Sequence, residues 1–162
     1  MKTIVRHRDQ GEGTWFLNGL MITKADATET GGAYCLMEHL LTAAANPPVH
    51  VQSDEEEAFY MLDGEIEFTI DHDVALATAG SFALVPRGAA HSFRVLTPTA
   101  RMLVISSSPQ GAPNGGLHHF FQAAGAPAPA HVLPTPQAPD PEVLGTLAAA
   151  HGIELLGPPR QS

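Results

Sequence analysis

The chain has 162 residues, of which 44% are hydrophobic and 15% charged, so it is long enough to bury the core of one domain. Its net charge of −9, from 17 acidic and 8 basic residues, argues against nucleic acid or an anionic membrane as the partner. The single cysteine, Cys35, excludes an intrachain disulfide and a cysteine-based zinc site. Residues 1–15 have no apolar segment typical of a signal peptide, and no stretch is long enough to span a bilayer. We therefore expect a cytoplasmic protein without a membrane partner.

Short apolar runs separated by turn residues fill the region from about residue 14 to residue 107. Many short strands at such regular spacing are typical of an all-β sandwich or barrel. The dipeptide Asp63-Gly64 is a strong signal for a two-residue hairpin between the runs on either side of it. The predicted runs are 33–41, 58–62, 65–70, 74–77, 82–86, 91–95 and 101–106.

The C-terminal part of the chain has a different pattern. Residues 116–125 predict a short helix, and residues 126–139 form a proline-rich connector that should run extended over the surface. A second helix is predicted over residues 140–152, where Asp140 is a suitable N-cap and Pro141 takes the first helical position. Its apolar stripe should pack on the barrel.

Four side chains in two separate segments are candidates for a metal site. His50 and Gln52 are two residues apart and share one face of a strand, because side chains alternate along a strand. Glu57 opens the next strand, and His91 begins a strand much later in the chain. If these strands are neighbours, two imidazoles, a carboxylate and an amide oxygen meet in the barrel mouth. Such a group can hold a divalent transition metal and leave positions open for a substrate or O₂.

The same segments resemble two motifs of the cupin superfamily. Residues 50–64 match the first, G-x5-H-x-H-x3,4-E-x6-G, from its first histidine onward, with Gln52 in place of the second histidine. Residues 80–95 match the second, G-x5-P-x-G-x2-H-x3-N, except that Val95 replaces the final asparagine. The resemblance covers roughly residues 14–107, and the C-terminal segment is similar to that of single-domain quercetin 2,3-dioxygenase-like cupins.

The resemblance implies a fold, a domain organisation and an oligomeric state. It implies an all-β cupin barrel, also described as a double-stranded β-helix or jelly roll. The barrel would occupy residues 1–110, and the helical tail with its proline-rich connector would occupy residues 111–162, packed on the barrel. The chain is also expected to form a homodimer, an expectation that the apolar outer faces of several strands favour.

The resemblance also implies a metal-dependent dioxygenase that opens a flavonol ring or acts on a similar small aromatic or polyketide-like molecule. His50, Glu57 and His91 would hold one divalent metal, and Glu57 would accept the proton of a substrate hydroxyl. The metal could be nickel, iron, manganese, copper or zinc. Gln52 could be the fourth ligand through its oxygen, or could hydrogen-bond a metal-bound water or the substrate.

Two other functions are compatible with the same residues. The first is a non-redox cupin, such as an isomerase, cyclase or decarboxylase, which uses the metal as a Lewis acid. The second is a non-catalytic cupin that binds a small molecule, in which Gln52 marks a degenerate metal site. A need for O₂ separates the dioxygenase from the first alternative, and metal retention separates both enzymes from the second.

Several further side chains can be assigned by strand phase. Tyr34, Leu36 and Glu38 share a face, so we expect His39 on the outer face of that strand. The acidic residues 54–56 are expected in a solvated turn, and His118-His119 in surface or packing positions because neighbouring helical residues diverge. The candidates for the pocket wall are Phe59, Met61, Phe82, Phe93, Met102, Tyr34 and Glu38.

Overall fold

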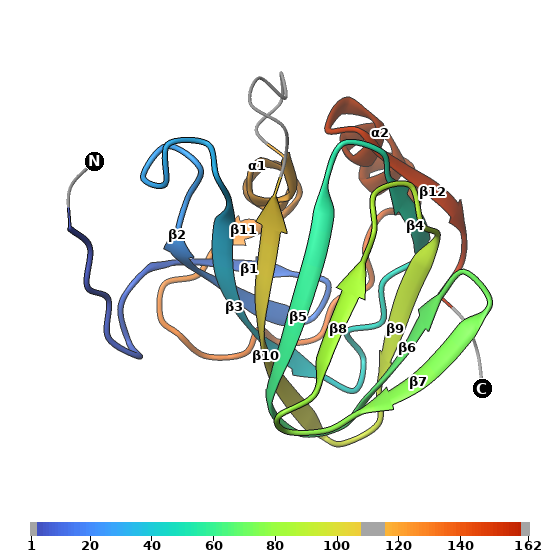
Figure 1. Cartoon of the computed structure of the whole chain (residues 1–162), viewed down its shortest axis with the longest axis horizontal. Coiled ribbons are helices and arrows are strands. Elements are labelled where there is room, and N and C mark those ends of the chain that lie inside the picture. The colour runs from blue at the N-terminus through green and yellow to red at the C-terminus, as the bar shows by residue number, and fades with distance from the viewer. Residues whose placement is uncertain (1–2, 108–115, 160–162) are drawn as a thin grey trace.

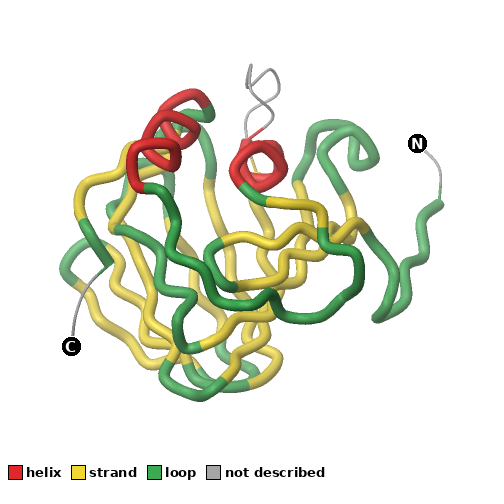
Figure 2. The backbone as a smooth tube through the Cα atoms, turned by 180° about the vertical axis from the view of Figure 1, so that it is seen from behind, coloured by secondary structure: helices red, strands yellow, loops and turns green. Residues whose placement is uncertain are grey.

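The structure is a computed structural model that describes residues 3–107 and 116–159. Two antiparallel β-sheets face each other, and two helices lie at one end of them (Figures 1 and 2). The predicted all-β class is confirmed, although the two sheets form an open sandwich and not a fully closed barrel. The predicted boundary between barrel and tail, at residues 110 and 111, lies outside the described residues.

The larger sheet contains seven strands in the order β11-β1-β2-β3-β10-β5-β8. Its inward side chains come from alternate positions of each strand and include the fully buried Met37, Met61, Met102 and Val104. In chain order the strands are β1 (Glu12–Phe16), β2 (Gly19–Ala25), β3 (Cys35–Thr42), β5 (Glu56–Asp63), β8 (Phe82–Val85), β10 (Thr99–Ser107) and β11 (Ala126–Pro127).

The smaller sheet contains five strands in the order β12-β4-β9-β6-β7. Ile66 and Phe68 are buried residues of this sheet, and Phe68 packs on Phe59 of the larger sheet with 5.1 Å between the ring centroids. The strands are β4 (Val49–Gln52), β6 (Ile66–Ile70), β7 (Asp73–Ala77), β9 (His91–Val95) and β12 (Ile153–Gly157).

The turn at Asp63-Gly64 differs from the prediction. It joins β5 of the larger sheet to β6 of the smaller one, so it is a crossing between sheets and not a hairpin. Gly64 has φ +78°, and a Cβ atom there would lie 2.6 Å from the carbonyl oxygen of Thr99. The glycine is required because the left-handed backbone and the neighbouring strand leave no room for a side chain.

The described residues form two helices, α1 (Gly116–Ala124) and α2 (Pro141–Ala150). The Asp140 side chain accepts hydrogen bonds from the backbone N–H groups of Glu142 and Val143, which confirms the predicted N-cap. The strand after α2 was not predicted: β12 adds to the edge of the smaller sheet beside β4. None of the helices in the described part of the chain combines the length and the hydropathy needed to cross a bilayer.

Helix α1 is attached to the sandwich through Glu55, which was expected in a solvated turn but is 7% exposed. Both carboxylate oxygens of Glu55 accept from the backbone N–H of Leu117, at 3.2 and 3.0 Å. A carboxylate at this position satisfies an N–H group that the first turn of a helix leaves free, and it complements the helix dipole. The acidic turn therefore fixes the helix that covers this end of the sandwich.

The outer face of the larger sheet carries a group of exposed apolar side chains. The strand register places Tyr60 beside Phe82 and Leu103, and Ala58 beside Leu84 and Ile105. Tyr60, Phe82, Leu84 and Ile105 are all exposed. The predicted homodimer stays a prediction, and this face offers a surface for it.

We expect the chain to elute with a mass near twice 17.1 kDa in size-exclusion chromatography with light scattering. The double variant Phe82→Ser, Leu84→Ser should shift it toward the monomer, because it removes two adjacent apolar side chains from the contact face. The matched control is Val74→Ser, Leu76→Ser, which changes another exposed apolar pair, on β7 of the other sheet. A monomeric wild-type protein, or equal effects of both pairs, would contradict the assignment.

Candidate metal centre

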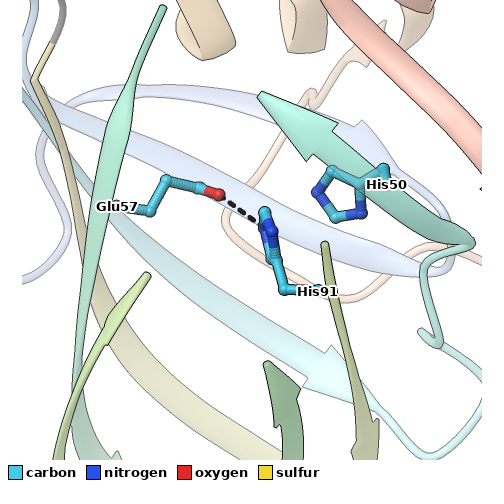
Figure 3. Close-up of side chains that lie close together, drawn as sticks. All are labelled: His50, Glu57 and His91. Atoms are coloured by element: carbon cyan, nitrogen blue, oxygen red, sulfur yellow. Dashed lines mark hydrogen bonds and ion pairs between the residues drawn. The ribbon is translucent and has the colours of Figure 1, made fainter. Parts of the chain in front are cut away.

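Three side chains from three strands meet where the two sheets face each other (Figure 3). His50 on β4 and His91 on β9 are directly paired in the smaller sheet, with 4.1 Å between their ring centroids. Glu57 reaches them from β5 of the larger sheet. One donor atom from each of the three residues lies within 4.8 Å of the other two. The structure thus brings together three of the four predicted ligands.

Both histidines are oriented by the same backbone contact. The Nδ1 atom of His50 lies 2.9 Å from the carbonyl oxygen of Pro48, and Nδ1 of His91 lies 3.0 Å from that of Ala89. A carbonyl oxygen can only accept, so each Nδ1 carries the proton. This leaves Nε2 as the atom that can bind a metal, and such a second contact commonly orients a metal-binding histidine.

Glu57 and His91 form a buried pair, with 2.9 Å between Oε2 of Glu57 and Nε2 of His91. Burial alone would raise the pKa of Glu57, but the hydrogen bond and charge of His91 outweigh it and lower that pKa. Burial would lower the pKa of His91, yet the bond to Glu57 raises it above its ordinary value. Burial, followed by the charge of His91, lowers the pKa of His50. Glu57 and His91 thus each favour the charged form of the other, whereas burial favours the neutral form of His50.

Gln52 lies on β4 two residues from His50 and is 3% exposed. Neither its Nε2 nor its Oε1 has a hydrogen-bond partner among the described residues. Such buried, unpaired amide atoms are uncommon in folded proteins. Gln52 is also not among the residues that line the neighbouring cavity, so its role as a fourth ligand stays a prediction.

The three side chains form one wall of a cavity of about 70 Å³. Apart from His39, His50, Glu57 and His91, all the side chains that line it in the described part of the chain are apolar. Of the seven predicted pocket residues, Phe59 and Phe93 line it. The tail contributes six further apolar side chains to the cavity wall, which the sequence did not predict. They are Leu117, Phe120, Phe121, Leu144, Ile153 and Leu155.

The other five predicted pocket residues lie elsewhere. Met61 and Met102 are register partners in the core and do not line the cavity. Phe82 is 63% exposed on the outer face, because the side chains of β8 that point inward are those at the alternate positions. Tyr34 is exposed, and Glu38 lies under a groove on the outer face of the larger sheet.

Strand β3 has the opposite phase from the predicted one. Both of its faces carry apolar residues, so alternation does not decide which face is buried in the core. Two cations decide which face of β3 is buried in the core. Nε of Arg101 donates to Oε1 of Glu38 at 2.6 Å, and Nζ of Lys24 lies 3.5 Å from Oε2 of Glu38. These cations keep Glu38 on the outer face, and His39 consequently points inward, where it is 4% exposed and lines the cavity.

Comparison with known proteins decides the family. The model of the family described as "Cupin domain" matches residues 37–106, a segment that runs from within β3 to within β10 and holds all three side chains of the site. This segment of the chain is a cupin domain. Quercetin 2,3-dioxygenase of Bacillus subtilis (strain 168) is 28% identical over 121 residues, which cover 72% of this cupin. The match spans 34% of that relative, so this cupin corresponds to about a third of its length.

Solved structures show the same fold. A predicted oxalate decarboxylase from Thermotoga maritima aligns with a TM-score of 0.58 at 17% identity, over 66% of this cupin and 100% of that chain. An RmlC-like cupin from Shewanella frigidimarina NCIMB 400 aligns with a TM-score of 0.54 at 14% identity, over 64% and 86%. At these identities the likeness concerns the fold alone.

The donor set fits a divalent transition metal. Two imidazole Nε2 atoms and a carboxylate are ligands that nickel, iron, manganese, copper and zinc all accept.

Metal affinity should depend on pH through His91. A metal must displace the Nε2 proton, and the pKa of His91 lies above its ordinary value of 6.5. Below that raised pKa, the apparent affinity should increase about tenfold per pH unit, and above it the affinity should level off. Competition titrations against a chelator between about pH 6 and pH 8 measure this slope. An affinity independent of pH over that range would contradict the raised pKa of His91.

Replacing the glutamine with the histidine of the motif tests position 52. Gln52→His should strengthen metal binding about tenfold or more without lowering the melting temperature, because a neutral imidazole is a better ligand than an amide. The measurement is the same competition titration. Val51→His is the matched control, since it places an imidazole on the opposite face of β4. Equal affinities of wild type and Gln52→His would show that position 52 does not reach the metal.

Proposed function

We propose that this cupin is a metal-dependent oxygenase that acts on a small, largely apolar aromatic molecule. The observation that carries the proposal is the trio of His50, Glu57 and His91, whose two histidines present Nε2 into an apolar cavity. The similarity to a quercetin 2,3-dioxygenase supports the reaction class.

Each residue has a task in this reaction. His50 and His91 would hold the metal through Nε2, and Glu57 would hold it through a carboxylate oxygen, with Gln52 as the fourth ligand or as a hydrogen-bonding neighbour. When bound, a redox-active divalent ion supplies the one-electron and Lewis-acid chemistry that a reaction of O₂ with an organic substrate requires.

Glu57 can also accept the proton of a substrate hydroxyl. Its pKa is lowered, so it is ionised at neutral pH and able to take up a proton. The position next to both histidines places this base at the metal end of the cavity. The proton acceptor and the metal would therefore meet the same substrate oxygen.

The apolar walls limit the substrate. Phe59 and Phe93 of the sandwich and Phe120 and Phe121 of α1 suit a flat ring, and their surfaces exclude water. A cavity of about 70 Å³ is smaller than the roughly 150 Å³ cavity that accommodates benzene. A substrate with one aromatic ring therefore requires an outward shift of its walls, and a flavonol requires a larger one.

Oxygen consumption tests the proposed function. The protein would be loaded in turn with nickel, iron, manganese, copper and zinc, its metal content measured, and O₂ uptake followed with quercetin and with single-ring dihydroxybenzenes. We expect uptake with at least one redox-active metal, none with redox-inert zinc, and none in His91→Ala, which loses a ligand and should bind no metal.

The other outcomes identify the alternatives. Conversion of a substrate without O₂ uptake would replace the oxygenase with a non-redox isomerase, cyclase or decarboxylase. Failure to retain any of the five metals would favour a non-catalytic cupin that binds a small molecule. A full complement of metal in His91→Ala would contradict the site itself.

A further inference from the structure

His39 is a fourth polar side chain at the cavity, and neither the motif nor the metal site accounts for it. It lies in the middle of β3, between Met21 of β2 and Met102 of β10 in the strand register. The residue is 4% exposed, and its Nε2 has no hydrogen-bond partner among the described residues. A buried ring nitrogen without a partner costs stability unless something else satisfies it.

His39 is separate from the metal-binding group. It is not among the three residues whose donor atoms lie within 4.8 Å of one another. Along the larger sheet, Glu57 is in the row of Ser106 and Cys35, whereas His39 is in the row of Met102 and Met61. The row of His39 therefore lies four positions along β3 from that of Glu57, although the two residues still interact electrostatically.

The surroundings keep the His39 ring neutral and in place. Burial lowers its pKa to about 4, so the imidazole is uncharged at neutral pH. The ring meets Phe121 of α1 edge to face, with 5.4 Å between the centroids. A neutral imidazole can donate or accept one hydrogen bond at Nε2, depending on its tautomer. It is thus suited to a hydroxyl or a carbonyl group and not to an anion.

We propose that His39 is a specificity-determining residue that hydrogen-bonds, through Nε2, a second polar group of a ligand whose first polar group meets the metal centre. The ligand class is an aromatic molecule with two hydroxyl or carbonyl groups separated by an apolar ring, since the rest of the cavity wall is apolar. The inference rests on the proposed function for the metal end of the cavity and adds the selectivity at the other end.

His118 offers a matched comparison within the same chain. It is also a buried histidine, 7% exposed, and both of its ring nitrogens lack partners among the described residues. It lies on α1 but does not line the cavity. A substitution there changes a buried, unpaired histidine without changing the proposed site.

The test measures binding, so it does not depend on turnover. Zinc-loaded wild type, His39→Leu, His39→Gln and His118→Leu would be titrated, without O₂, with phenol and with the three dihydroxybenzenes. NMR line shifts or calorimetry report the affinities, and metal analysis reports the zinc content of each protein. Because zinc is redox-inert, the binding result is valid even if the protein has no oxygenase activity. Loss of zinc from the wild type would instead show that the metal site is wrong.

In the wild type, at least one dihydroxybenzene should bind about three- to tenfold more tightly than phenol, as expected for one additional hydrogen bond. His39→Leu should remove this preference at unchanged zinc content, His39→Gln should retain part of it, and His118→Leu should retain all of it. A preference that persists in His39→Leu would overturn the proposal, as would no preference or no binding in the wild type. Loss of zinc in His39→Leu would make His39 a metal ligand and would also overturn it.

Discussion

The hydrogen bond between Glu57 and His91 joins one sheet to the other in a mostly apolar interior, and several contacts of the fold support it. A buried carboxylate without a compensating partner would be strongly destabilising. The backbone carbonyls of Pro48 and Ala89 hold the two imidazoles in place, and β4 and β9 set them side by side. Helix α1, fixed by Glu55, then closes this end of the sandwich over the pair. The side chains of the site are therefore themselves part of the packed interior between the two sheets.

The sequence was sufficient for some parts of this arrangement because they depend on local geometry. The spacing of His50 from Glu57 and the turn residues before His91 place ligands on strands whose alternation is clear. Strand β3 lacked such a signal, because both of its faces are apolar and the deciding contact, between Glu38 and Arg101, joins residues far apart in the chain. As a result, His39 was assigned to the wrong face, and Tyr34 and Glu38 were assigned to the pocket.

The contribution of the tail could not be predicted for a related reason. The apolar segment "IELLG" after Gly152 has the signs of a strand, but a strand has no partner that can be identified from its own residues. Only the assembled fold shows that β12 pairs with β4 and that α1 supplies Phe120 and Phe121 to the cavity. Missing hydrogen-bond partners do not by themselves mark a functional residue either. His39 and His118 share that property, and their positions relative to the cavity distinguish them.

The pairing of β12 with β4 also determines when β4 acquires its second neighbouring strand during synthesis. The strand that carries His50 is held on one side by β9 and on the other by β12, which comes about a hundred residues later in the chain. When residues 37–106 have been synthesised, β12, the last strand that pairs with β4, has therefore not yet been made. Until β12 is made, β4 is an unprotected edge that can pair with another nascent chain. The cavity wall to which Ile153 and Leu155 of β12 belong is likewise complete only after β12 has paired with β4.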